Sequence, residues 1–207
     1  MVNRKYTAMR FNNQSATKIG KGAFSTAYRV DGTDQVFILT KLDSDSNKYI
    51  KEIYTHIKKK HVPYMRTIGI EVYMPRVGYV NVYESRYYAP LTAKNKQAWS
   101  DYKVLNRAWD QVYYDNVNLV MNSRGDEYID RHVVVAEFIE RLTINQSVSQ
   151  DIIDALDSIY TWATAFSTGF LFEFPKHNLR VDQDGNLILL DIVFFMTPTE
   201  DRKARNW

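Results

Sequence analysis

The stretch FEFPKHNLRVDQDGNLILLD, residues 172–191, contains a polar loop, a tight turn and an apolar run. The turn is Asp184-Gly185-Asn186, a combination that favours a reversal of the chain because glycine accepts positive φ angles. The segments on either side, residues 178–181 and 187–192, are rich in Leu, Ile and Val. The stretch therefore predicts a β-hairpin that follows a polar loop.

Three oxygen-bearing side chains, Glu173, Asn178 and Asp191, lie on either side of this hairpin. Carboxylate and amide oxygens suit Mg²⁺, which keeps several waters and is shared with substrate phosphates. Asp191 directly follows an apolar run, where a carboxylate is costly unless it is paired or bound to metal. We therefore expect Asp191 to be a metal ligand, with a capping aspartate as the alternative.

Upstream of residue 172 the sequence predicts helices. Ser149 is a candidate N-cap for a helix over about residues 150–167. Apolar residues recur on one face of that helix, at Ile152, Ile153, Leu156, Ile159, Tyr160 and Ala163. Residues 94–120 also have helical character. Residues 133–144 leave two alternatives open, because the run VVV favours a strand and the following AEFIE favours a helix.

The first part of the chain has a different pattern. Residues 15–40 are rich in β-branched and aromatic residues and are punctuated by glycines, which predicts strands and turns. In NKYIKEIYTHIKKKH, residues 47–61, apolar residues recur at a spacing of four, which predicts an amphipathic helix. Residues 68–88 return to an extended pattern. The order of strands, helix, strands and then mainly helices predicts an α+β plan with two unlike halves.

A pair of glycines marks the first hairpin, in the segment IGKGAFSTAY at residues 19–28. Gly20 and Gly22 would let the backbone approach a ligand closely, because no Cβ intrudes. Backbone N–H groups at such a turn can face phosphate oxygens, although an ordinary β-turn explains the same residues. The segment opens a hairpin and not a helix, which argues against a Rossmann fingerprint or a Walker loop.

A lysine closes the apolar run VFILT, residues 36–40. Lys41 either places one positive charge inside the protein or emerges into solvent. Glu52 shares a helix face with Ile53 and His56 and would point toward the protein. A Lys41–Glu52 pair would hold the ammonium group for a phosphate, and a solvated Glu52 is the alternative.

The composition is that of an ordinary globular protein, with 207 residues, 45% hydrophobic residues, 25% charged residues and a net charge of +3. The absence of cysteine excludes disulfides and thiolate metal sites, and the N-terminus has no apolar core of signal-peptide length. We therefore expect a cytoplasmic protein with no membrane segment. The basic runs at residues 58–61 (KKKH) and 202–205 (RKAR) predict solvated surface, with contact to nucleic acid as the alternative.

Together these features resemble the protein kinase-like fold, and specifically the small early protein kinases of T7-like bacteriophages. IGKGAFSTAY is similar to a glycine-rich loop, and VPYMRTIGIEVYMP with the following YVNVYE to the middle of the small lobe. FEFPKHNLRVDQDGNLILLD is similar to the catalytic loop, hairpin and metal-binding aspartate. The resemblance implies one minimal two-lobed domain. Its antiparallel-sheet N-lobe would span about residues 1–92 and its reduced helical C-lobe about residues 93–207.

The resemblance also implies roles for individual residues. ATP would be covered by the glycine-rich loop, made of Gly20, Lys21, Gly22, Ala23, Phe24 and Ser25. Lys41 would contact the α- and β-phosphates while paired to Glu52. Asn178 and Asp191 would hold Mg²⁺. Glu173, five residues before Asn178, would take the place of the aspartate that accepts the proton of the substrate hydroxyl.

The chain departs from the family pattern at several of these positions. Ser25 stands where a third glycine is usual, and Leu39 competes with Lys41 for the lysine position. Ile192-Val193 replaces the Phe-Gly that follows the metal-binding aspartate. Glu173 is one methylene longer than aspartate, which moves its carboxylate by about one ångström, and such a displacement can cost on the order of a hundredfold in rate.

The leading hypothesis is therefore an ATP- and Mg²⁺-dependent Ser/Thr protein kinase that phosphorylates host proteins, such as RNA polymerase, during phage infection. The alternative is a pseudokinase that binds and inhibits a host protein without phosphoryl transfer. A small-molecule phosphotransferase of the same fold is a third interpretation, although such enzymes use a larger helical lobe than this chain offers.

Overall fold

A computed structural model places the chain in two compact units, Met1–Thr55 with Tyr64–Tyr87, and His56–Pro63 with Tyr88–Trp207. Among the helices described, none combines the length and the apolar character that a membrane span requires. The structure describes residues 8–11, 14–22, 25–41, 45–74, 78–116, 131–167 and 169–195.

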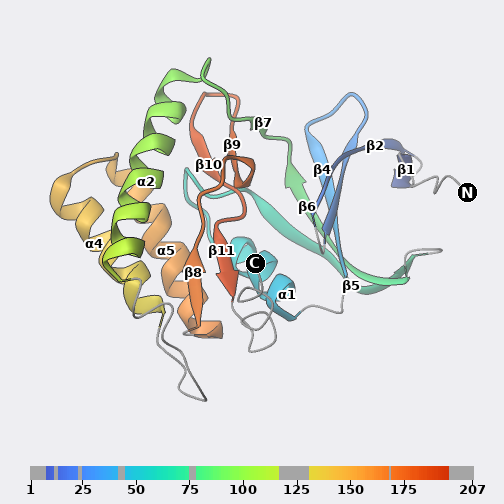
Figure 1. The fold of residues 1–207 in the computed structure, drawn as a ribbon. Helices are drawn as coiled ribbons and strands as arrows, with labels where there is room; N and C mark the ends of the chain where they lie inside the picture. The colour runs from blue at the N-terminus through green and yellow to red at the C-terminus, as the bar shows by residue number, and fades with distance from the viewer. Residues whose placement is uncertain are drawn as a thin grey trace, which may run out of the picture. The chain divides into compact units, whose positions relative to one another are not determined.

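The first unit is built on one six-stranded antiparallel sheet, with strand order β1-β2-β3-β4-β6-β5 (Figure 1). Helix α1 (Asp45–His56) follows the fourth strand. The strands are β1 (Ala8–Phe11), β2 (Gln14–Lys21), β3 (Ser25–Val30), β4 (Gln35–Lys41), β5 (Met65–Met74) and β6 (Gly78–Arg86). The predicted strands of the first part of the chain are confirmed, and the helix predicted within residues 47–61 is observed as α1, although residues 57–61 are not helical.

Side chains along β4 alternate between the two faces of this sheet. Phe37 and Leu39 lie on one face, within a buried cluster that also contains Ala16, Tyr28, Val30, Val80 and Val82. Ile38 and Thr40 point to the opposite face, where Ile38 lies across from Tyr83 on β6. Both faces of β4 are therefore buried, which explains why its sequence is a continuous apolar run without polar alternation.

In its described residues, the second unit combines three α-helices with short strands. Helix α4 packs against α2 and α5, and α2 also packs against β10. Strand β9 pairs with β10 and β7, and β8 pairs with β11. The helices are α2 (Lys96–Asp115), α4 (His132–Asn145) and α5 (Gln150–Phe166), with a 3₁₀ turn η1 (Lys176–Asn178). The strands are β7 (Ala89–Pro90), β8 (Phe170–Phe172), β9 (Leu179–Val181), β10 (Leu187–Leu189) and β11 (Val193–Phe195).

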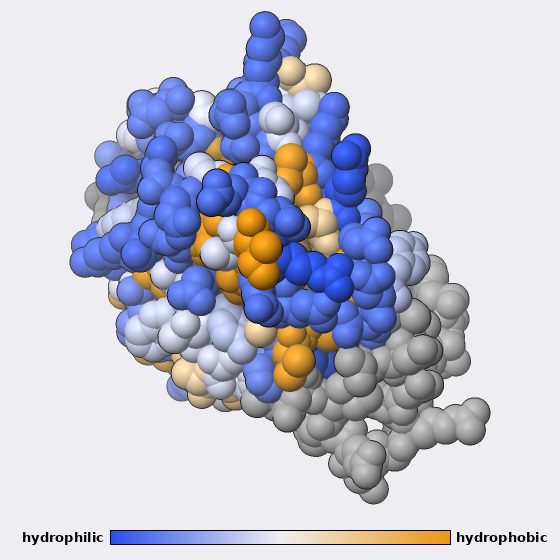
Figure 2. Space-filling model, turned by 90° about the vertical axis from the view of Figure 1, so that its left-hand side faces the viewer, coloured by the Kyte–Doolittle hydropathy of each residue, from blue (hydrophilic) through white to orange (hydrophobic). Residues whose placement is uncertain are grey.

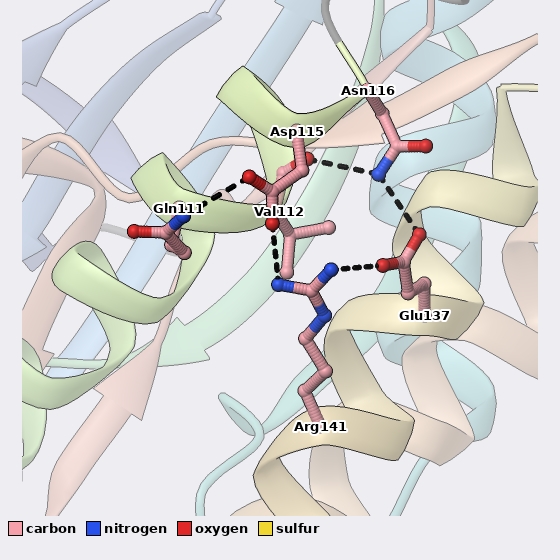
Figure 3. Close-up of polar contacts among 6 residues, drawn as sticks. All are labelled: Gln111, Val112, Asp115, Asn116, Glu137 and Arg141. Carbon is pink, nitrogen blue, oxygen red and sulfur yellow. Dashed lines mark hydrogen bonds and ion pairs between the residues drawn. The ribbon is translucent and has the colours of Figure 1, made fainter.

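Helices α2 and α4 are joined by a polar network near the end of α2 (Figure 3). Arg141 donates to Asp115 at 2.6 Å and also to Glu137, one turn away on its own helix. Asn116 donates to the second oxygen of Glu137 at 2.8 Å, and Gln111 donates to Asp115 at 3.0 Å. The hydrogen bond from Arg141 is the main reason why the pKa of Asp115 is lowered. These bonds fix the two helices to each other on either side of the intervening residues 117–130.

The helical predictions for this unit are largely confirmed. The predicted helix over residues 150–167 is α5, with Ser149 at its N-cap position, although the Ser149 hydroxyl makes no capping hydrogen bond. Residues 133–144, which left two alternatives open, are helical in α4. The helical segment at residues 94–120 is observed as α2, and its last residues, 117–120, lie outside the described part of the chain.

The segment that follows α1 runs along β10 in the second unit. The Nδ1–H of His61 donates to the main-chain oxygen of Leu187 at 2.7 Å, and Leu189 N–H donates to the His61 oxygen at 2.9 Å. His61 is also buried, with 4% of its surface exposed, so the expectation that residues 58–61 are all solvated surface is wrong for His61. The three lysines before it are exposed. The second basic run, residues 202–205, lies outside the described residues.

Candidate functional site

The polar loop after β8 lies beside the segment that carries Asp191. Glu173 N–H donates to the Ile192 oxygen at 2.7 Å, which continues the pairing of β8 with β11. The main-chain oxygen of Asn178 accepts hydrogen bonds from Leu190 N–H at 3.0 Å and Asp191 N–H at 3.2 Å. The main chain therefore brings the loop of Glu173 and Asn178 next to Asp191.

The carboxyl group of Glu173 lies in a partly dehydrated environment. Its pKa is raised, first because neighbouring protein atoms remove water from the carboxyl group and second because of the negative charge of Asp191. His177 acts in the opposite direction and lowers it. Glu173 as a whole residue is nevertheless exposed, so water is removed from only part of it. The charge of Asp191 thus acts on a carboxyl group from a separate segment, and shifted carboxyl groups of this kind are common at functional sites.

The donor set at this place suits Mg²⁺ in its chemistry. Asp191 supplies carboxylate oxygens and Asn178 an amide oxygen, and the Asn178 side chain makes no hydrogen bond within the described part of the chain. Mg²⁺ in proteins is commonly held by one or two carboxylates, with water and phosphate oxygens in the other positions. Among the residues that the structure describes, no group of three or more His, Asp or Glu side chains could enclose a metal by itself. In their chemistry the donors match a metal that is shared with phosphate, and within the described residues they form no closed metal cage.

An aromatic cluster supports this loop from within the second unit. Phe174, next to Glu173, is buried with 3% of its surface exposed. Its ring lies 5.4 Å from Phe138 of α4, 6.1 Å from Trp109 of α2 and 6.2 Å from Phe172 of β8, between ring centroids. Phe174, two residues before η1, is therefore anchored in the core, which limits where Glu173 can place its carboxylate.

The glycine hairpin lies in the first unit, between β2 and β3. Gly22 N–H donates to the Ser25 oxygen at 2.8 Å, and the Ser25 hydroxyl shares a hydrogen bond with Thr40 at 3.0 Å. A Cβ at Gly20 or Gly22 would come no closer than 4.0 or 3.9 Å to other atoms, and neither residue has a positive φ. Nothing in the packing of the described residues therefore requires glycine at these two positions. Lys21 is exposed beside them, and the predicted site residues Ala23 and Phe24 lie outside the described residues.

Lys41 and Glu52 are both described, and no ion pair joins them. Lys41 is exposed at the end of β4 and lies opposite Val80 of β6. Because side chains alternate along a strand, Lys41 lies on the same face of the sheet as Leu39, the other residue that could occupy the family's lysine position. Glu52 is half-buried in α1. The pKa of Tyr83 is raised, first by burial and second by the negative charge of Glu52, which indicates that Glu52 lies near Tyr83. Tyr83 lies on the opposite face of the sheet from Leu39 and Lys41. The assignment of Lys41 as a phosphate contact therefore stays a prediction.

Sequence reasoning missed residues that the structure places around the loop. His177 acts electrostatically on Glu173, and its position within the predicted catalytic loop was the available signal. The Lys176 ammonium lies over the ring of Trp99 in α2, 5.3 Å from its centroid. No sequence signal connects Lys176 with Trp99, because they are far apart in the chain.

No protein-family model matches the sequence, and no curated protein resembles it in sequence. Solved structures with some likeness include a mutant aminoglycoside 2'-phosphotransferase in complex with GDP. It is 14% identical, with a TM-score of 0.33, and the match covers 86% of this chain and 68% of that chain. Another is spectinomycin phosphotransferase in complex with ADP and spectinomycin, which is 12% identical, with a TM-score of 0.34 and coverage of 90% and 66%. A likeness this low carries no argument about activity. The α+β fold, with an antiparallel sheet unit before a mainly helical unit, follows from the chain's own elements.

Proposed function

We propose that this chain is an ATP- and Mg²⁺-dependent protein kinase that phosphorylates Ser or Thr of host proteins, in the manner of the early kinases of T7-like phages. The observation that carries the proposal is the meeting of Glu173 with Asp191 beside Asn178. Host proteins such as RNA polymerase, in the host cytoplasm, are the partners that the resemblance implies. The two glycines that the packing does not require further support an approach by phosphate.

In this reaction Glu173 acts as the general base. A raised pKa brings its proton affinity closer to that of a base working near neutral pH. Glu173 takes the proton of the acceptor hydroxyl, the hydroxyl oxygen forms a bond to the γ-phosphorus, and the bond from that phosphorus to the leaving ADP oxygen breaks. Asp191 and Asn178 would hold Mg²⁺, which neutralises charge on the phosphate oxygens when bound.

The test is transfer of label from γ-labelled ATP to host-cell lysate proteins by the purified chain with Mg²⁺. We expect the Asp191→Ala variant to lose transfer, because it removes the carboxylate from the site. Asp184→Ala is the matched control, since Asp184 is exposed in the β9–β10 turn. Circular dichroism verifies that both variants are folded. Equal transfer by the parent chain and the Asp191→Ala variant would contradict the proposal.

A pseudokinase is the second candidate, and one observation favours it. Lys41 is not paired to Glu52, although the resemblance implies that this pair orients the phosphates. Calorimetric titration with Mg-ATP separates the two candidates when it is combined with the transfer assay. Binding of Mg-ATP without transfer to any lysate protein supports the pseudokinase, and transfer by the parent chain excludes it.

A further inference from the structure

Two lysines from separate segments share one aromatic ring in the second unit. The Lys176 ammonium of η1 lies 5.3 Å from the ring centroid of Trp99, and the Lys103 ammonium of α2 lies 5.8 Å from it. Tyr102 packs on the same indole at 5.3 Å between centroids. Trp99 is half-buried and both lysines are exposed. Two positive charges are thus held beside one partly accessible ring, over which cations are attracted to the π-face.

No acidic side chain of the described residues neutralises these two charges. Within the described part of the chain neither lysine forms an ion pair. The closest acidic residue in sequence on α2, Asp101, accepts a hydrogen bond from Gln97 at 2.9 Å. The charges that shift the pKa of the Glu173 carboxyl are those of Asp191 and His177. Among the residues that the structure describes, Lys176 is therefore not part of a salt bridge.

The surroundings of α2 are hydrophilic. Figure 2 shows the side on which α2 and α4 lie in Figure 1, and that face is mostly polar, with small separate hydrophobic patches. Among the described residues of α2, the buried ones are Ala98, Leu105, Trp109 and Val112. Most of its remaining side chains are polar, although Tyr114 is 71% exposed and Val104 is half-buried. A partner segment recognised here would be selected by charge, since no broad apolar surface is offered.

We propose that Trp99, Lys103 and Lys176 recognise an acidic side chain of the protein acceptor. The inference rests on the proposed function, because it takes Glu173 as the place where the acceptor hydroxyl reacts. Lys176 is three residues from Glu173, and an extended chain spans at most about 3.5 Å per residue, or about 10 Å over that distance. An Asp or Glu within about three residues of the acceptor Ser or Thr therefore reaches the lysines.

The carboxylate of such a residue would pair with the ammonium groups that lie over the indole ring. Its own hydrocarbon stem would lie against the ring, so that the site uses charge and apolar contact together. The same two charges would repel an acceptor that carries lysines or amino groups at that position. The substrate class is accordingly a hydroxyl residue in an acidic sequence.

The test measures binding of short fluorescent peptides by anisotropy, without ATP, so that it is independent of catalysis. One peptide has Ser flanked by Glu, and the other has Ser flanked by Lys. We expect the chain to prefer the acidic peptide and the Lys103→Gln/Lys176→Gln variant to bind it roughly tenfold more weakly, as loss of two exposed ion pairs predicts. Lys58→Gln/Lys59→Gln is the matched control, because it removes two exposed lysines elsewhere in the second unit. Trp99→Leu should also weaken binding of the acidic peptide.

Several results overturn the inference. Equal binding of the two peptides, or an equal loss in the control variant, means that recognition does not depend on this site. Displacement of the acidic peptide by a lower concentration of single-stranded RNA means that the site serves nucleic acid. If the acidic peptide binds as expected but no label is transferred from ATP, the kinase proposal fails and the recognition site stands.

Discussion

Removing the ring of Phe174 tests whether the core positions the base. Only 3% of the side chain is exposed, and its ring meets three other aromatic rings within 6.2 Å. Truncation of a buried Phe to Ala costs about 3–5 kcal/mol, which includes the loss of edge contacts worth about 0.5–1.5 kcal/mol per aromatic pair. Against a total stability of about 5–15 kcal/mol for a typical domain, this is a large fraction.

Urea unfolding of Phe174→Ala, followed by tryptophan fluorescence and by circular dichroism, measures this cost. Trp109 lies next to the new cavity and reports on it directly. Phe194→Ala is the control, because the same truncation at a half-buried position of β11 should cost less than about 2 kcal/mol. Where the variant remains folded, phosphoryl transfer should fall by about a hundredfold if the base moves by about one ångström. Equal losses of stability in the two variants would refute the view that Phe174 is a core anchor.

Further predictions concern charge and hydrogen bonding. Asp191→Asn should lower the pKa of Glu173, because the substitution removes a negative charge that raises this pKa. Part of the upward shift should remain, because burial also raises the pKa. NMR titration of the Glu173 carboxyl group measures the change, and an unchanged pKa would contradict the prediction. The pKa of Asp115 is lowered, chiefly by its hydrogen bond with Arg141. The ionised carboxylate therefore stabilises the fold at pH values above its pKa in the unfolded chain, which is about 3.9. This stabilisation is lost as the pH falls through the lower pKa of the folded state. Arg141→Gln should therefore flatten the dependence of unfolding free energy on pH between about 5 and 2, and an unchanged slope would count against the network. His61→Ala should lower the unfolding free energy by about 1–3 kcal/mol, because a buried main-chain oxygen of β10 loses its donor; urea unfolding at neutral pH measures this, and no loss would contradict that account.

Local patterns in the sequence predicted the elements whose cause is local. Helix α5 was predictable because Ile152, Leu156 and Ile159 recur on one face at helical spacing, and all three are fully buried. The β9–β10 hairpin was predictable because Gly185 adopts a φ of +84°, which its turn requires and glycine tolerates. In both cases the residues that decide the structure lie within a few positions of one another.

Tertiary contacts decided what the sequence left open. The run at Val133 favours a strand locally, yet α4 forms because Val134, Phe138 and Leu142 line one side of a helix that packs on its neighbours. Val133 itself is 51% exposed. Tertiary packing thus overrides the β-propensity of a short run, as expected when propensities differ by about 1 kcal/mol or less.

In the candidate site, too, some residues were predictable from local sequence and others depended on tertiary structure. Glu173, Asn178 and Asp191 were predictable as a group, because a loop and a hairpin close in sequence also come together in space. The relation of Lys41 to Glu52 was not predictable, because it depends on which face of the sheet each side chain meets. A strand pattern gives the alternation but not the face that a following helix approaches.

The face on which Lys41 lies is firmly fixed by the rest of β4. Moving Lys41 to the side of Tyr83 would require a register slip of one residue, and such a slip exchanges the two faces of the whole strand. Phe37 and Leu39 would then leave their buried cluster, and their burial is worth about 1.5–3 kcal/mol for each side chain. A pairing of two exposed or half-buried charges is worth about 1 kcal/mol or less and cannot offset that loss. The sheet therefore keeps Lys41 and Glu52 apart, and the assignment of chemistry to this chain depends on the carboxylates of the second unit.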